Sequence, residues 1–349
     1  MKTFDEIIGN DAIKGYLTHM VDKGAVGNSW LFSGIAGVGK GLFAEALANR
    51  LLDYPERQNH PDLTIIRPQG KLGMHSIEAI RNLGVEAQQA PFEAPAKVFI
   101  IHDAEKMLPT SANALLKTFE EPATTTVIIL LSSVPEQLLP TILSRCRKIA
   151  FQPVPQEEIE AFLKAQDKEP SFAALSRGSP ARALRLADRG TDEKRELLLK
   201  VLSFGRFKDF GQLQSVVTKL SADIDEQKKA TEAALQEQHI TSDLTATQKA
   251  TLMKEIDGAV AAQYLEEVDA LFDIILSWYR DLTLLHVDGN KSQLFNRDAM
   301  PALEQALQSG TTLSLDTVQE TLASIRLAIA RSLPLSQCLE SLFLRLNFL

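Results

Sequence analysis

The sequence contains few cysteines, no long apolar run and no excess of positive charge. Only Cys146 and Cys338 occur in 349 residues, which excludes a four-cysteine zinc site and is typical of a reducing environment. No stretch approaches the roughly 20 apolar residues that a membrane-spanning helix requires. The first ten residues, MKTFDEIIGN, lack the apolar core of a signal peptide, so we expect a cytoplasmic protein.

The charge balance also limits the function. There are 37 Lys and Arg against 45 Asp and Glu, which gives a net charge of −8. Such a chain is a poor ligand for DNA phosphates by itself, although a local basic patch can still contribute within an assembly. The composition, 45% hydrophobic and 23% charged, is that of a globular protein, and the length allows two or three domains.

Short apolar runs and helical patterns alternate over the first 150 residues, which predicts an α/β domain with a parallel sheet at residues 1–154. Strands are expected at 29–34, 63–68, 97–103, 126–133 and 149–151, with helices at 42–52, 76–88 and 111–122. In the last of these helices Ser111 is the expected N-cap and Pro122 the stop.

No strand pattern follows residue 155. Residues 155–204 are predicted to form a small helical domain, and residues 205–349 a larger all-helical domain in which Pro334 separates the last two helices. The polar segment 221–251 is interpreted as exposed helices or a mobile excursion.

The segment GIAGVGKG, residues 34–41, resembles a phosphate-binding loop placed between a strand and a helix. Gly34, Gly37, Gly39 and Lys40 are the candidate nucleotide-binding residues, since glycines let backbone N–H groups surround a phosphate and the lysine neutralises its charge. Gly41 stands where a Ser or Thr normally binds magnesium, so phosphate transfer is expected to suffer more than binding. Whether the loop still binds ATP or ADP stays open.

A P-loop site also needs an acidic residue at the end of an apolar strand, and Asp103 follows VFIIH in that position. In ring-forming ATPases the next residue is a Glu that orients water, whereas this chain has Ala104. The alternation of side chains along a strand predicts that Glu105 faces away from the site. With Gly41, two positions needed for hydrolysis are changed, which favours lost catalysis.

The order of FDEIIGN, GIAGVGKG, NHPDLTII, KVFIIHDAEKM, ANALLKTFEEP, LLPTILSRCRKIAF and RGSPARAL resembles that of bacterial clamp-loader subunits of DNA polymerase III, within the AAA+ class. The resemblance covers about the first 190 residues and continues in the WYRDL segment. It implies an AAA+ (RecA-like) P-loop domain, a helical lid and a C-terminal helical collar for oligomerisation. The altered loop and the HDAE strand end favour the non-hydrolysing δ′ type.

The resemblance implies a role for LSRC: Arg145 would be an arginine finger that reaches the ATP of a neighbouring subunit. It further implies γ/τ-type and δ-type subunits, the sliding clamp and primed DNA as partners. Relatives that bind zinc carry four cysteines after the P-loop helix, and LLDYPERQNHPD has none, so no zinc is expected. Hydrolysing members carry an Arg at the fourth position of GSxR, whereas here Ala181 holds it and Arg182 follows.

Three other readings stay open. The chain could be an ATP-hydrolysing motor subunit of the γ/τ type, against which Gly41 and Ala104 argue. A remodelling AAA+ ATPase would need the Glu that Ala104 replaces. A nucleotide or nucleoside kinase would need Ser or Thr at position 41.

Overall fold

A computed structural model describes residues 3–53, 60–68, 74–189, 193–239, 246–308, 313–346 and 348. The chain divides into two compact units, Met1–Arg189 and Gly190–Leu349, and each is described by itself. The first unit is an α/β domain with short helices after it. The second contains helices joined by turns, with no strand among its described residues.

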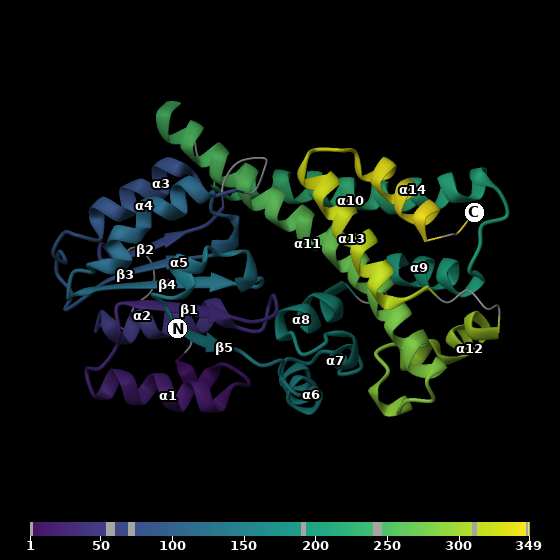
Figure 1. Cartoon of the computed structure of the whole chain (residues 1–349), viewed down its shortest axis with the longest axis horizontal. Helices are drawn as coiled ribbons and strands as arrows, with labels where there is room; N and C mark the ends of the chain where they lie inside the picture. Colours follow the sequence, from purple (N-terminus) through teal and green to yellow (C-terminus); the bar gives the residue numbers. More distant parts are fainter. Residues whose placement is uncertain are drawn as a thin grey trace. The chain divides into compact units, whose positions relative to one another are not determined.

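The first unit is built on a five-stranded parallel sheet in the order β2-β3-β4-β1-β5 (Figure 1). The strands are β1 (Ser29–Ser33), β2 (Leu63–Ile66), β3 (Lys97–Ile101), β4 (Thr126–Ser132) and β5 (Arg147–Ala150). All five predicted strands are therefore confirmed. Because β1 lies between β4 and β5, the glycine loop that follows it emerges beside the carboxyl end of β4.

Helices cover both faces of this sheet. They are α1 (Asp11–Asp22), α2 (Lys40–Leu51), α3 (Ile77–Glu86), α4 (Pro109–Glu120) and α5 (Pro140–Leu143). Alternate strand residues divide between the faces, as the strand period requires. Trp30 and Phe32 pack in the core under α1 and α2, whereas Leu31 and Phe99 pack in the core under α3, α4 and α5.

Helix α4 begins earlier than the sequence analysis predicts. Pro109 takes the first helical position, where its missing N–H costs nothing and its fixed φ suits the helix. Ser111 therefore lies inside the first turn, where its side chain is buried, and the prediction that it caps the helix is wrong.

Three short helices complete the first unit: α6 (Gln156–Lys164), α7 (Phe172–Leu175) and α8 (Pro180–Arg189). They contact one another, and their apolar residues join the core cluster under α2. The next helix, α9 (Glu193–Phe204), belongs to the second unit because Leu198 and Leu202 are buried in that unit's core. From the sequence alone, residues 193–204 are expected in the lid instead, and the three-domain division stays a prediction.

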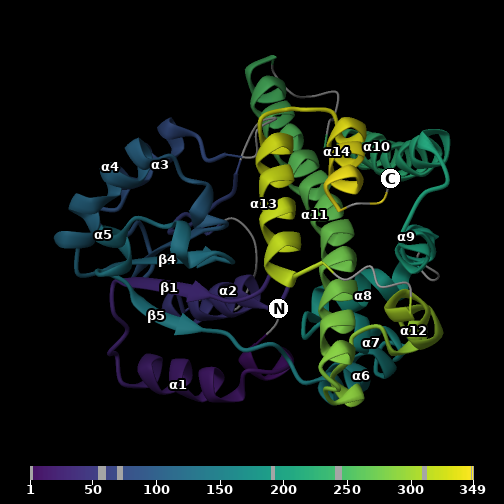
Figure 2. The ribbon, with the colours of Figure 1, turned by 45° about the vertical axis from the view of Figure 1, so that its right-hand side comes forward.

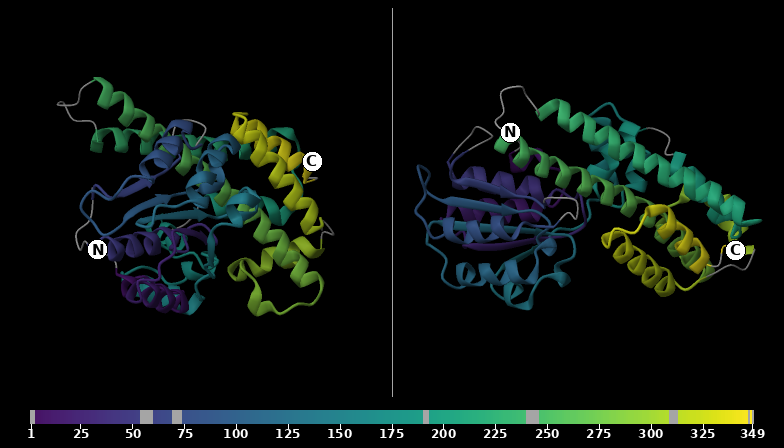
Figure 3. Two further views of the ribbon diagram at one scale, coloured as in Figure 1. Left: turned by 60° about the vertical axis from the view of Figure 1, so that its left-hand side comes forward. Right: turned by 90° about the horizontal axis from the view of Figure 1, so that it is seen from above.

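The described part of the second unit contains α9 and five further α-helices. They are α10 (Phe210–His239), α11 (Ala246–His286), α12 (Met300–Gln308), α13 (Leu315–Ala330) and α14 (Leu335–Arg345). The 41 residues of α11 span about 60 Å at 1.5 Å per residue. Helix α10 runs beside α11 (Figure 3), and α13 lies along it (Figure 2). Pro334 precedes α14, as predicted, and the polar segment 221–251 lies in α10 and α11 except for residues 240–245, which are outside the described part.

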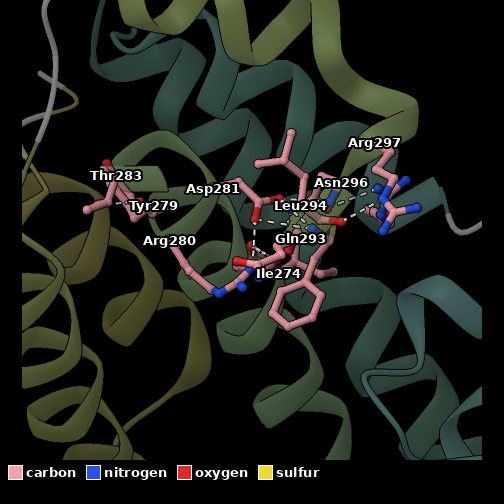
Figure 4. A network of polar contacts seen from close by, with 12 residues as sticks. Ile274, Tyr279, Arg280, Asp281, Thr283, Gln293, Leu294, Asn296 and Arg297 are labelled. Atoms are coloured by element: carbon pink, nitrogen blue, oxygen red, sulfur yellow. Dashed lines mark hydrogen bonds and ion pairs between the residues drawn. The ribbon is translucent and has the colours of Figure 1, made fainter. Parts of the chain in front are cut away.

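Within WYRDL, Asp281 fastens the turn after α11 to the helix (Figure 4). Its carboxylate is fully buried and accepts hydrogen bonds from the backbone N–H groups of Phe295 and Asn296, the latter at 2.8 Å. It also accepts from the Asn296 side chain at 2.9 Å and from Arg280 at 3.0 Å. A buried carboxylate is tolerated only with such partners.

Replacing Asp281 with Ala should lower the free energy of unfolding by about 3 kcal/mol, because buried N–H donors lose a charged acceptor. Urea denaturation of the full chain measures this. Glu304→Ala is the control, since Glu304 makes only an exposed ion pair at 3.8 Å to Lys291, and its loss should cost under about 1 kcal/mol. Equal effects of the two substitutions would contradict the assigned role of Asp281.

Candidate functional site

The glycine loop leaves β1 and ends at the first residue of α2, as predicted. Gly34, Gly37 and Gly39 have φ values of 149°, 75° and 110°, and Gly39 is the N-cap of α2. The strand, loop and helix of a phosphate-binding loop are therefore present. Whether this loop can bind a nucleotide depends on which side chains occupy the space inside it.

Lys40 is bound to its own loop. Its ammonium donates to the carbonyl oxygens of Gly34 at 2.5 Å and Ile35 at 2.9 Å, and to Ser133 Oγ at 3.1 Å. These bonds match the three protons of the group. Burial lowers the pKa of Lys40 to about 8, against the opposing effect of Glu105 and then Asp103. Ser133, which directly follows β4, thus accepts a hydrogen bond from Lys40.

The first turn of α8 and Ser179, which precedes it, close on the loop at Gly37. The Ala181 N–H donates to the Gly37 carbonyl at 3.3 Å. A Cβ at Gly37 would lie 2.4 Å from Ser179 Oγ and 2.9 Å from the Ala181 Cβ. Glycine is thus required by close packing. Ala181 holds the position that resembles the phosphate-contacting Arg of motor subunits, and Arg182 is turned by about 100° around the helix from it.

His102 occupies the space beside Gly41. A Cβ at Gly41 would lie 3.3 Å from His102 Cε1, which is tighter than an ordinary contact. Burial first, and then Arg67, lowers the pKa of His102 to about 4, so the imidazole is neutral. Arg67 can only donate in its 3.1 Å contact with His102 Nδ1, which places the ring proton on Nε2. A neutral ring therefore lies against position 41, where a P-loop carries its metal-binding Ser or Thr.

The acidic residues lie differently from the prediction. Asp103 has a left-handed backbone (φ 47°, ψ 54°), and residues Ala104–Lys106 form a 3-10 helix. Glu105 Oε1 accepts the Ser133 N–H at 3.2 Å, and Glu105 acts on Lys40 more strongly than Asp103 does. The prediction that Glu105 faces away is wrong, because β3 ends at Ile101 and its alternation does not extend through the turn. Asp103 instead pairs with Lys106 at 3.2 Å.

Arg145 lies in the turn between α5 and β5 and points outward. Its side chain is 34% exposed and donates to Glu120 Oε1 at 2.7 Å, to the Thr141 carbonyl at 3.0 Å and to Ser144 Oγ at 3.3 Å. These partners belong to α4 and α5 and not to the glycine loop. The next residue, Cys146, is buried, and burial raises the pKa of its thiol to about 12. Cys146 therefore anchors the turn by packing and leaves Arg145 at the surface.

The described residues contain no group of three or more His, Cys, Asp and Glu side chains placed to hold a metal. Much of the segment in which the resemblance would place zinc ligands, residues 54–59, lies outside the described part of the chain. Among the described helices, none is long and apolar enough to cross a membrane.

Comparison with known proteins finds a family and relatives that are similar in sequence to part of the chain. Residues 9–155 match the family described as "DNA polymerase III, delta subunit". Over these residues the chain is similar to the DNA polymerase III delta subunit family. The chain is 33% identical over 175 residues to DNA polymerase III subunit delta' of Bacillus subtilis, covering 46% of this chain and 52% of that one. It is 34% identical over 191 residues to the same subunit of Pseudomonas aeruginosa, covering 48% and 58%.

The chain thus spans only about half the length of these two relatives. A DNA polymerase III gamma subunit-related protein from Thermotoga maritima is similar in structure, with 20% sequence identity, 91% of this chain and 98% of that chain covered, and a TM-score of 0.38. That score is too low to carry an inference. The family assignment therefore rests on the N-terminal region.

The lowered pKa of Lys40 predicts a pH effect on stability. Between pH 8 and 10.5 the unfolded lysine keeps a proton that the folded one has lost, so the unfolded state binds more protons and stability rises with pH. Relative to Lys40→Met, the free energy of unfolding of the unmodified chain should rise by about 1 kcal/mol per pH unit across this window. Denaturant melts at several pH values measure it. The same comparison with Lys117→Met, at an exposed position, should be flat, and a flat result for Lys40 as well would refute the assignment.

The contact between Gly41 and His102 predicts that a hydroxyl-bearing residue at position 41 costs stability while His102 is present. Gly41→Ser should cost about 1 kcal/mol more of unfolding free energy in the original chain than in the His102→Ala background, because the ring no longer opposes the new Cβ. A double-mutant cycle by chemical denaturation measures this coupling. Additive effects would mean that His102 does not restrict position 41.

Proposed function

We propose that this chain is a non-hydrolysing subunit of the bacterial replicative clamp loader in the DNA polymerase III holoenzyme. It helps to load the sliding clamp onto primed DNA and supplies Arg145 to the ATP of a neighbouring subunit. The observation that carries the proposal is the outward position of Arg145 beside a buried Cys146, in a chain whose own loop lysine is bound to its own carbonyls.

The chemistry of Arg145 suits a role in a neighbour's site. A guanidinium stays charged and offers a planar fork of donors, which stabilises the charge that develops on a transferred γ-phosphoryl group. The backbone of Arg145 is fixed by the buried cysteine that follows it and by α5, whose last turn supplies the Thr141 carbonyl. Because the backbone of this turn is fixed and the Arg145 side chain is partly exposed, the guanidinium can reach a neighbouring subunit's site without local unfolding of the turn.

The chain's own glycine loop, in contrast to Arg145, is occupied by contacts within the chain. Lys40 is satisfied internally, Ala181 and Ser179 close on Gly37, and His102 fills the space beside Gly41. We therefore propose that this loop is structural, holds neither ATP nor ADP tightly, and hydrolyses neither. In this proposal the short helices α6–α8 are the lid, and the helices of the second unit pack with γ/τ-type and δ-type subunits in a collar.

The test compares two substitutions in the assembled complex. Arg145→Ala should slow turnover at the one neighbouring site by about 10³-fold or more, the range measured for arginine fingers, without loss of assembly. Lys40→Met should leave turnover of the complex unchanged, because the loop that it alters contributes no hydrolysis. Steady-state ATPase assays and size-exclusion chromatography of the complex provide the two measurements.

Arg145→Lys serves as the matched control for charge. It keeps the cation but loses the fork, so most of the rate should still be lost. If Arg145→Ala left turnover intact, or if Lys40→Met abolished it, the assignment of roles would be reversed.

One observation favours a second candidate, an ATP-hydrolysing motor subunit of the γ/τ type. Glu105 lies beside Lys40, and its Oε2 atom is buried without a hydrogen bond among the described residues. A carboxylate in that place could orient water. In that case the isolated chain would hydrolyse ATP, and Glu105→Gln would abolish the activity.

A further inference from the structure

We propose that Glu120 is a positioning residue that holds Arg145 in a retracted state until a neighbour's nucleotide displaces it. The inference rests on the proposed function, since it concerns the same arginine. Its basis is the ion pair of 2.7 Å between Arg145 and Glu120, which joins residues 25 positions apart in the sequence.

The two side chains are placed by separate elements. Glu120 is the last residue of α4, and Arg145 follows α5 in the turn before β5. The apolar sides of both elements are fixed in one core, which includes Phe119 and Cys146. The backbone at each end of the ion pair is therefore anchored by a buried neighbour, and only the two side chains can move.

The retracted state engages both terminal nitrogens of the guanidinium. The NH2 group donates to the Glu120 carboxylate, while NH1 donates to the Thr141 carbonyl and to Ser144 Oγ. Ser144 Oγ itself donates to the same Thr141 carbonyl at 3.1 Å. A planar fork bound in this way cannot present both nitrogens to a phosphate at the same time. Binding of a γ-phosphate therefore requires that the carboxylate be exchanged for phosphate oxygens.

The energetics allow this exchange. The Glu120 side chain is 50% exposed and that of Arg145 34% exposed, so solvent screens their attraction. Exposed ion pairs of this kind shift an equilibrium by up to about fivefold. A triphosphate carries more charge than one carboxylate and can displace it. The contact is thus strong enough to retain the arginine in the absence of a nucleotide and weak enough to release it.

The test uses the assembled complex and its kcat/KM for ATP at low ionic strength. Glu120→Gln should raise kcat/KM by up to about fivefold, because the arginine is no longer retained. The matched control is Glu121→Gln, an exposed neighbour at the end of the same helix, which should change nothing. At about 0.5 M salt the effect of Glu120→Gln should disappear, since salt screens the pair in the original chain as well.

The effect must depend on the arginine. In an Arg145→Ala background, Glu120→Gln should have no effect on kcat/KM, whereas a general structural effect of the substitution would persist there. Thermal denaturation of each full chain controls for folding. NMR of the arginine side chains in the isolated full chain gives an independent check, because rotation of the Arg145 guanidinium should be slow in the original chain and fast in Glu120→Gln.

The outcomes separate the two proposals. If Arg145→Ala slows the complex but Glu120→Gln does not change it, the inference about Glu120 is wrong and the role of Arg145 stands. If Glu120→Gln slows turnover as Arg145→Ala does, Glu120 holds the arginine in its productive state, and retraction is refuted. If Arg145→Ala has no effect, both proposals fail.

Discussion

The hydrogen bonds of Lys40 to its own loop are the interaction on which the rest of the site depends. In a working P-loop the lysine ammonium compensates phosphate charge. Here it is 8% exposed, and the carbonyl oxygens of Gly34 and Ile35, with Ser133 Oγ, accept its hydrogen bonds. Burial of a cation is tolerated because these acceptors and the nearby Glu105 compensate it in part, as the lowered pKa of about 8 indicates.

The chain's own side chains also occupy the surroundings of the loop. Gly41 leaves room that the neutral imidazole of His102 takes, and Gly37 leaves room that Ser179 and Ala181 take. Each of these contacts would have to be undone before a metal-bound triphosphate could enter. The same fold keeps Arg145 at the surface, on a turn fixed by a buried cysteine. In the proposed function the phosphate loop is structural, and Arg145 acts at the nucleotide site of another subunit.

Much of the first unit can be predicted from the sequence because its strands are continuous apolar runs that begin and end in turns. The glycine loop is equally predictable, since its spacing and its place between strand and helix are specific. The errors arise where local geometry overrides a period. Pro109 starts α4 before Ser111, and the left-handed backbone of Asp103 turns Glu105 back toward Lys40. No pattern in the sequence indicates the Glu120–Arg145 ion pair, because a contact between residues 25 positions apart depends on how α4 and α5 pack.

Binding of Mg-ATP to the isolated full chain, measured by isothermal titration calorimetry, tests the central claim most directly. A loop whose lysine, metal position and Gly37 face are all occupied by the chain itself should show no binding up to about 1 mM ATP, an affinity worth only about 4 kcal/mol. Binding in the micromolar range that is lost in Lys40→Met would contradict this account, because it would require the loop to open and Lys40 to exchange its carbonyl partners for phosphate.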